Sequence, residues 1–442
     1  MSAGGRREPG ALKLAGVLAA LGMLLWISIP RLTVLVLPLA VALPSAWQIQ
    51  EGRGVPRPRV GLLPLVLGLF AAYLWANALW SENFGYAIGS AAAITAFMML
   101  WSVGVEALTN GHPRLLRALG IGLCAGMALG GCYLLIDELG SRVIWSAVRV
   151  AAMRLANPGL PSDISPCREP WRCDAFVLNL GATAFTSGLF PVLLVASALV
   201  APARRLWLVL AGILLGCLVV FSTVHGSSKI AITLGGAVFF LSHIFPRTTT
   251  ALLAAAWVAA TMLIVPITQA AYALGLHETS YLPDSARGRI IIWKHTGDRV
   301  AKAPLGGIGI GSTRVRRWMA SAANMERLPR TEFLLDTSIH AHNFFLQAWY
   351  ELGAIGAGFL LVIGLLALKA ITHHPEATQP YLFATFVAVG TLCNSTFSLF
   401  ALWLIASIVL TALCACLGLT LWSSRPVPIR SAAGVVAGSI HR

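Results

Sequence analysis

Charged residues are scarce in this 442-residue chain, in which Asp, Glu, Lys and Arg together account for only 11% of the residues. Soluble globular domains carry about 25% charged residues, so this composition argues against a soluble catalytic domain. The chain also lacks a Walker A motif, a Rossmann fingerprint in a strand–helix context and any internal repeat with a period of roughly 20–50 residues. No convincing cleavage site follows the basic N-terminus, which favours a retained first helix over a removed signal peptide.

Hydrophobic residues, by contrast, make up 57% of the chain, and the mean hydropathy is +0.78. Apolar runs recur from end to end at roughly 20 residues, the length at which a helix crosses the hydrocarbon core. We therefore predict an all-α, polytopic membrane protein with about twelve transmembrane helices. The predicted spans begin near residues 12, 32, 60, 87, 115, 175, 206, 230, 250, 343, 381 and 401.

The basic residues of most short loops fall on one side of the predicted bundle. By the positive-inside rule that side is cytoplasmic, and both termini lie there. The short loops 80–85 and 394–400, on the opposite side, carry no Lys or Arg. The basic residues that set this orientation are Arg6, Arg7, Lys13, Arg53, Arg57, Arg59, Arg114, Arg117, Arg204, Arg205, Arg247, Lys369, Arg425 and Arg430.

This topology divides the chain into four parts. Helices one to nine occupy 1–272 and include a smaller external loop at 140–174, and a large external loop follows at 273–342. The last three helices occupy 343–422, and 423–442 form a cytoplasmic tail.

Both long loops are rich in arginine and explain much of the net charge of +15. This charge fits attraction to anionic lipid headgroups, at about 1 kcal/mol per basic residue, and equally fits an anionic substrate. In the smaller loop, Cys167 and Cys173 flank two arginines, and an oxidising compartment permits a disulfide between them. A metal site there is less favoured, because the two thiols have no evident further ligands.

The large loop contains the segment DSARGRIIIWKHTGDRVAKAPLGGIGIGS, residues 284–312. Its first half predicts a helix at the membrane surface, with Ile290, Trp293, Gly297 and Val300 on one face. Pro304 cannot continue a helix, and the glycines after it let the backbone approach a ligand closely. A phosphate cradle is conceivable here, although the glycine spacing matches no known phosphate-binding motif.

Three cations of the non-cytoplasmic side are candidates for binding an anion. Arg287 and Arg289 carry the planar, permanently charged guanidinium group that suits bidentate phosphate binding, although either side chain can also extend to lipid phosphates. Lys229 lies in a very short turn between two predicted spans. It either anchors a helix end or reaches an anion in a central cavity.

A pair of histidines precedes the tenth predicted span in the stretch SIHAHNFF. His340 and His342 point about 200° apart on a helix, but share a face in an extended segment. A structural zinc site is not favoured, because the sequence offers no strong third ligand. Imidazole titrates near pH 6.5 and suits a general base, whereas the alternative is a capping or headgroup contact at the helix that starts at Asn343.

These segments, taken in order, resemble the O-antigen ligase and O-antigen polymerase superfamily. The resemblance rests on Arg289-x-x-x-Trp293, on PLGGIGIGS at 304–312, and on HNFFLQAWYELGAIG at 342–356. The last stretch matches the family signature H-N-x-x-L-Q-x-x-x-E-x-G-x-x-G and includes Glu351. One departure is visible: the family commonly has Ser-Arg where this chain has Ser228-Lys229, and lysine keeps the charge without the bidentate fork.

The resemblance implies glycosyl transfer from a glycan carried on undecaprenyl diphosphate, at the periplasmic face of the bacterial inner membrane. Arg289, helped by Arg287 and Lys229, is then expected to hold the diphosphate, and His342 to act as the base. His340, Asn343, Glu351 and Trp293 are expected to support the site, with Glu351 either pairing with a cation or held by a local hydrogen bond. No metal or other cofactor is expected, and no nucleic-acid partner.

Three activities of the superfamily differ in the acceptor. A ligase transfers the glycan to the lipid A-core, a polymerase to another lipid-linked unit, and a protein oligosaccharyltransferase to serine or threonine. We favour the ligase, because one external loop dominates, and place the protein transferase last, because its usual extra C-terminal region is missing here. A lipid-linked glycan transporter is the rival from another class, but it would place ionisable residues at mid-membrane and usually shows inverted repeats.

Overall fold

The computed structural model describes residues 8–58, 61–140, 144, 170–315, 340–395 and 397–424, with the backbone alone for 170–178. All the regular elements in these ranges are helical. The longer helices are α1 (Glu8–Ser28), α2 (Thr33–Gln50), α3 (Leu62–Ala78), α4 (Phe84–Thr109), α5 (Pro113–Leu139), α7 (Pro170–Leu199), α8 (Arg205–Ser222), α9 (Gly226–Ile244), α10 (Pro246–Ala273), α11 (Asp284–Val300), α15 (Gly353–Thr372), α16 (Gln379–Cys393) and α17 (Leu402–Ser423). Short 3₁₀ turns precede α2 and α8, and the four-residue helix α14 (Phe344–Gln347) leads through a π-helical turn, Ala348–Leu352, into α15.

The predicted all-α, polytopic membrane architecture is confirmed. In the described part of the chain, 10 helices have the length and apolar composition needed to cross a membrane. The shorter apolar helices α3 and α16 stand at the two remaining predicted positions. Each predicted span begins within a few residues of the start of an observed helix. In lipid the backbone N–H and C=O groups of an apolar run can form hydrogen bonds only with each other, and a helix provides them.

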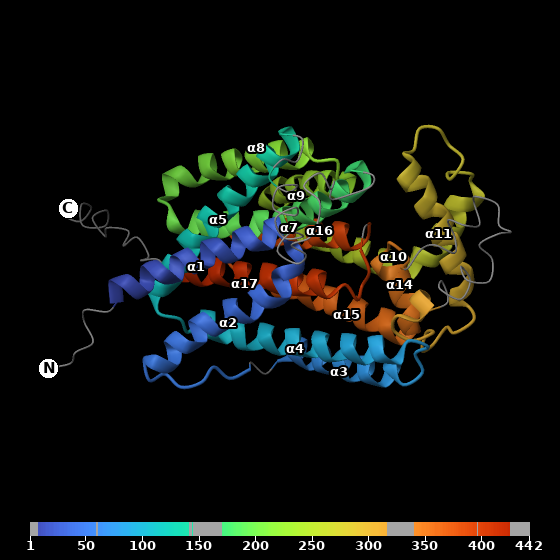
Figure 1. Cartoon of the computed structure of the whole chain (residues 1–442), viewed down its shortest axis with the longest axis horizontal. Helices are drawn as coiled ribbons and strands as arrows, with labels where there is room; N and C mark the ends of the chain where they lie inside the picture. The colour runs from blue at the N-terminus through green and yellow to red at the C-terminus, as the bar shows by residue number, and fades with distance from the viewer. Residues whose placement is uncertain are drawn as a thin grey trace, which may run out of the picture.

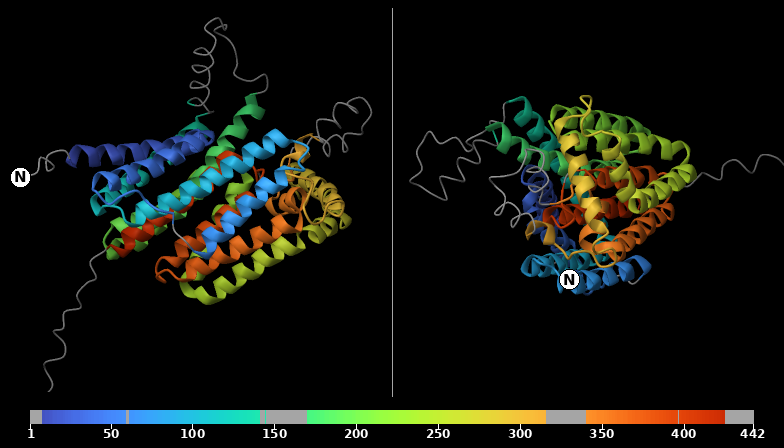
Figure 2. Two further views of the ribbon diagram at one scale, coloured as in Figure 1. Left: turned by 90° about the horizontal axis from the view of Figure 1, so that it is seen from below. Right: turned by 90° about the vertical axis from the view of Figure 1, so that its right-hand side faces the viewer.

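The spanning helices form a bundle with a distinct structure at each end. The first and last described helices, α1 and α17, have their outer ends at the left of Figure 1, and α11 lies at the right. Helix α11 runs across the axes of the bundle helices rather than along them, as Figures 1 and 2 show. We call the end of the bundle with the outer ends of α1 and α17 the terminal end, and the end covered by α11 the α11 end.

Small residues allow the closest helix packing. A Cβ atom added to Gly122 of α5 would lie 2.1 Å from the carbonyl oxygen of Gly16 in α1, and one added to Gly126 would lie 2.4 Å from that of Ala20. These glycines are four residues apart and so lie on one face of α5. Glycine at the interface lets two backbones touch, which stabilises helix pairs in a membrane where burial of apolar surface gives little driving force.

Candidate active site

Helix α11 forms one wall of the candidate site and packs on the bundle by the predicted face. Ile290, Gly297 and Val300 are buried, and Trp293 packs into an apolar cluster with Phe345 and Tyr350. The helix is also tied to α10, because the Gln269 amide donates to the carboxylate of Asp298 at 2.9 Å. The predicted helix, its buried face and its end before Pro304 are therefore confirmed.

The glycine-rich connection after α11 is tied to the helices around it rather than left open for a ligand. Its N–H groups from residue 307 to residue 311 all donate within the protein. The acceptors are the carbonyl oxygens of Ala303, Tyr350 and Glu351, the side chain of Asn77, and the carboxylate of Glu351. Because each N–H is already used, this backbone is not arranged as a phosphate cradle.

The glycines of this connection are required by backbone conformation and by space. Gly307, Gly309 and Gly311 have φ values of 68°, 95° and 72°, in the left-handed region that favours glycine. A Cβ added to them would lie within 2.5 Å of Glu351, Ser81 and Tyr86. Gly353, with φ of 68°, faces the same connection from the other side, where a Cβ would lie 2.2 Å from the Leu305 carbonyl oxygen. The spacing of glycines in the sequence thus reflects packing between segments 304–312 and 350–356.

Gly309→Ala should therefore destabilise the protein. The new methyl group would meet the backbone of Ser81 at a φ of 95°, and a strained backbone of this kind costs of order 1–3 kcal/mol before the clash is counted. We expect a lower thermal unfolding midpoint and a lower yield of purified protein in detergent. The matched control is Gly236→Ala in α9, where an added Cβ meets nothing within 4 Å. Equal unfolding midpoints in the two variants would contradict the packing role.

Glu351 is the buried anchor of this arrangement. Its side chain is 1% exposed, and its carboxylate accepts from the Gly311 N–H at 3.1 Å and from the Gln347 amide at 3.3 Å. The π-helical turn around it leaves its carbonyl oxygen free of the usual helical partner, and that oxygen accepts from Gly309 at 3.0 Å. The second of the two expectations for Glu351, a buried carboxyl held by local hydrogen bonds, describes what is observed.

The histidine pair lies directly before helix α14. The ring centroids of His340 and His342 are 4.1 Å apart, so the two imidazoles lie side by side rather than on opposite faces of a helix. His342 has a φ of 50°, and it is the one non-glycine residue with positive φ among the described residues. Such a conformation costs free energy and collects at functional sites, where the surrounding fold maintains it.

Asn343 fixes where this helix starts. Its side-chain oxygen accepts from the N–H of Leu346 at 2.9 Å, which makes it the N-cap of α14. The cap holds the chain just after His342, so the left-handed residue cannot join the helix. The capping expectation therefore applies to Asn343 rather than to His342.

Arg289 faces the turn between α8 and α9. Burial lowers the pKa of its guanidinium. Burial of His225, together with the charge of Arg289, lowers the pKa of that imidazole to about 4. His225 is therefore neutral at pH 7, and its Nδ1 is 2.7 Å from the hydroxyl of Ser228. The result is a permanent cation beside a neutral, buried imidazole.

The depressed pKa of His225 predicts a pH dependence of stability. In the unfolded chain this imidazole takes up a proton near pH 6.5, whereas in the folded protein it resists protonation down to about pH 4. The unfolded state then binds more protons between these values, so the free energy of unfolding falls as the pH falls through this window. Stability from this group is fully present above pH 6.5 and is lost towards pH 4.

Thermal unfolding of the purified protein at pH 7 and at pH 4.5 would measure this effect. His225→Gln should reduce the difference between the two midpoints, because glutamine does not titrate. His243→Gln, an exposed histidine in the last turn of α9, is the control and should leave the difference unchanged. A pH difference that is the same in wild type and in His225→Gln would refute the assignment.

A series of contacts links Arg289, the histidine pair and His225 at the α11 end of the bundle. Trp293 lies one helical turn after Arg289, and its apolar cluster includes Ala341, the neighbour of both histidines. Phe344, which follows Asn343, packs against the apolar cluster that contains Phe397, and the Phe397 ring lies 6.3 Å from the ring of His225. Figure 1 shows α11 and α14 next to each other at this end.

The two other predicted diphosphate-binding cations, Arg287 and Lys229, have surroundings that differ from those of Arg289. The guanidinium of Arg287 pairs with Asp284 on the outer side of α11. The ammonium of Lys229 lies 5.8 Å from the centre of the Phe221 ring, which points it along α8. From the turn that contains Lys229, the side chain that faces Arg289 is His225.

Buried polar atoms near α11 remain unpaired. The indole N–H of Trp293 and the Nε of Arg287 are buried and have no hydrogen-bond partner among the described residues. Buried donors are nearly always paired in folded proteins. The indole N–H of Trp293, on the packed face of α11, therefore fits a site that receives an acceptor-rich ligand, whereas Arg287 points about 120° away from it around the helix. The proposed disulfide between Cys167 and Cys173 lies outside the residues whose side chains the structure describes.

Sequence reasoning missed His225 and Asn77. His225 stands in the same short turn as Lys229, and a histidine directly before a membrane helix was the available signal. Asn77 is fully buried in the apolar helix α3, where its amide donates to the Gly306 carbonyl at 2.9 Å and its oxygen accepts from Ile310 at 2.9 Å. A lone amide inside a membrane helix usually has such an interhelical partner.

One family model matches the part of the chain that contains the candidate site. No curated protein matches the chain. Residues 211–361 match the family model described as O-antigen ligase, and this segment includes His225, Arg289, the glycine-rich connection, His342 and Glu351. This segment, about a third of the chain, therefore supports the resemblance to the O-antigen ligase superfamily that the sequence motifs indicate.

Proposed function

We propose that the chain is an O-antigen ligase, which transfers glycan from undecaprenyl diphosphate to the lipid A-core oligosaccharide during lipopolysaccharide biosynthesis. The reaction takes place at the periplasmic face of the inner membrane and inverts the anomeric carbon. The single observation that carries the proposal is the gathering of Arg289, His225 and the His340–His342 pair at one end of the bundle, inside the matched segment.

The diphosphate leaving group requires positive charge from the protein. Breaking the bond between the sugar and the diphosphate leaves growing negative charge on the phosphate oxygens. A fixed cation in a partly dry site stabilises that charge without having to reorganise. Arg289 meets this requirement, because it is partly buried and keeps its charge. Arg287 and Lys229 lie further out and would contribute mainly to attracting the diphosphate.

His342 is the proposed general base. It would remove the proton from the acceptor hydroxyl while that oxygen attacks the anomeric carbon from the side opposite the diphosphate. Its strained backbone and the N-cap that follows it hold the imidazole in a defined position. His340, in ring contact with it, would fix its orientation, and Trp293 offers its unpaired indole N–H to the glycan or diphosphate.

Purified protein incubated with lipid-linked glycan, with and without lipid A-core, tests this function. New core-linked glycan that appears only with the acceptor supports the ligase. Longer lipid-linked chains in the absence of acceptor would identify a polymerase instead. Movement of labelled lipid-linked glycan between leaflets without a new glycosidic bond would identify a transporter.

Activity should persist in EDTA. In the proposed reaction the charge on the leaving diphosphate is met by arginine, so no divalent ion is required. Initial rates with and without excess EDTA should agree within the error of the assay. Loss of activity in EDTA, followed by recovery on addition of a divalent ion, would contradict this part of the mechanism.

A further inference from the structure

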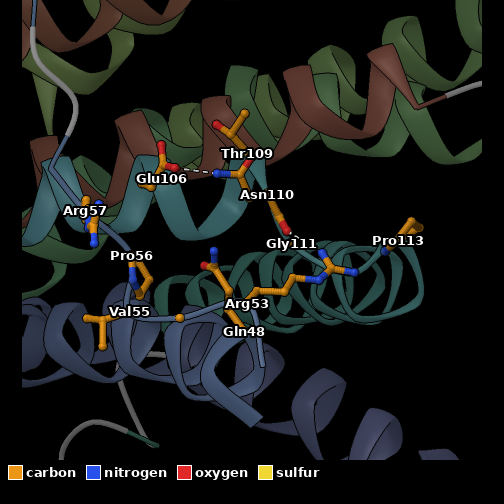
Figure 3. Close-up of a pocket in the computed structure, with 11 residues that line it drawn as sticks. Gln48, Arg53, Val55, Pro56, Arg57, Glu106, Thr109, Asn110, Gly111 and Pro113 are labelled. Atoms are coloured by element: carbon orange, nitrogen blue, oxygen red, sulfur yellow. Dashed lines mark hydrogen bonds between the residues drawn. The ribbon is translucent and has the colours of Figure 1, made fainter. Parts of the chain in front are cut away.

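A second hollow lies at the terminal end, opposite the candidate site. It has a volume of roughly 840 Å³ and is formed by the end of α2, the segment after it, the end of α4 and the start of α5 (Figure 3). Volumes of this order are typical of small-molecule sites. We call it the α2–α4 hollow.

The α2–α4 hollow contains a buried side-chain oxygen that lacks a hydrogen-bond donor among the described residues. Gln48 is 6% exposed, and its side-chain oxygen has no hydrogen-bond partner among the described residues. Figure 3 shows its amide directed into the space between Pro56 and the end of α4. A buried acceptor is nearly always paired, so this oxygen fits a ligand that brings a donor such as a hydroxyl group.

Two arginines give the hollow its charge. Arg53 is held in place, because its Nη1 donates to the Asn110 carbonyl at 2.7 Å and its Nε lies 3.2 Å from the Glu51 carboxylate. Arg57 lines the hollow from the following segment and is exposed. Glu51 and Glu106 balance the two arginines in number, so the attraction for an anion comes from Arg57, whose guanidinium forms no ion pair with the described residues.

The rim of the hollow is apolar on the side that faces outward. Val55, one of its lining residues, is 71% exposed. Ile49 at the end of α2 and Leu62 at the start of α3 are also exposed. In a membrane protein, exposed aliphatic side chains at the end of a bundle are the surface on which acyl chains pack.

We propose that the α2–α4 hollow binds the headgroup of an anionic phospholipid that carries hydroxyl groups, of the phosphatidylglycerol type. The phosphodiester would lie against Arg57 and Arg53, and a headgroup hydroxyl would donate to the Gln48 oxygen. Val55 and Ile49 would contact the acyl chains. A soluble glycerol phosphate presents the same polar chemistry without the chains, so the two sources are separated by experiment.

Delipidated, full-length protein in neutral detergent provides the test. Native mass spectrometry would follow titration with phosphatidylglycerol, phosphatidylcholine and sn-glycerol 3-phosphate. We expect saturable binding of phosphatidylglycerol, weaker by about tenfold in Arg57→Gln, which loses a charge-assisted hydrogen bond, and by about fivefold in Gln48→Leu, which loses a neutral one. The control is Arg117→Gln, an exposed arginine of α5 that does not line the hollow, and it should bind like wild type.

The outcomes separate clearly. Saturable binding of glycerol phosphate that is weakened by the same two substitutions would support the polar site with a soluble ligand. Phosphatidylglycerol that binds no better than phosphatidylcholine, or equally well to wild type and Arg57→Gln, would overturn the proposal. Arg57 is exposed, so this variant should fold even if Gln48→Leu does not.

Discussion

His342→Ala should reduce glycan transfer by about 10²–10⁴-fold, the contribution typical of a general base, while the protein remains folded and in the membrane. The acceptor hydroxyl is a poor nucleophile at neutral pH, and without the imidazole its proton has no defined acceptor. Transfer of glycan to lipid A-core by purified protein would measure the rate. Alanine keeps the Cβ atom and therefore the same backbone strain at this position, so we expect the free energy of unfolding to change little.

Two histidine variants sharpen this result. His373→Ala, at the other end of helix α15, removes an exposed imidazole and should leave transfer unchanged. His340→Ala removes the neighbouring ring and should lower the rate less than His342→Ala, because that ring orients the base without accepting the proton. Full activity in His342→Ala, or a larger loss in His340→Ala, would require the base to be reassigned.

The positions of the helices could be predicted from the sequence because each depends on local composition. An apolar run predicts a span wherever it occurs, and the bundle agrees with those runs. Helix α11 was predictable for a related reason: Ile290, Gly297 and Val300 recur at helical spacing, and the same residues are buried. Pro304 then predicted a change of direction that the chain makes.

The parts that sequence reasoning missed depend on contacts between distant residues. Glu351 could have paired with a cation or with its neighbours, and only the approach of Gly311 from 40 positions away decides between these. Asn77 shows the same limit, because its partners Gly306 and Ile310 belong to a segment more than 200 positions later. His225 gains its low pKa from burial and from Arg289, and neither is encoded near it in the chain.

The direction of a side chain is a further limit. Lys229 was attractive because its charge lies in a tight turn, but one residue on a helix changes direction by about 100°. Ser228 faces His225 and is fully buried, whereas Lys229 lies over Phe221 on α8. Spacing alone could not say which of the two adjacent residues points towards His225.

Arg289→Ala should lower the rate of glycan transfer by about 10²–10³-fold, the loss seen when one donor to a developing anion is removed. Its guanidinium is the cation of α11 that acts on the buried His225. Arg289→Lys should retain part of the activity, because lysine supplies the charge but not two parallel donors. Lys294→Ala, on another side of the same helix and paired with Asp298, is the matched control and should be close to wild type.

A second measurement separates a role in charge stabilisation from a role in folding. If the charge of Arg289 lowers the pKa of His225, that pKa should rise in Arg289→Ala, and the loss of stability below pH 6.5 should become smaller. The variant would then be slow in transfer and less sensitive to acid unfolding at the same time. General misfolding predicts the reverse, with lower stability at every pH. A variant that transfers glycan at the wild-type rate would rule out Arg289 as the residue that stabilises the departing diphosphate.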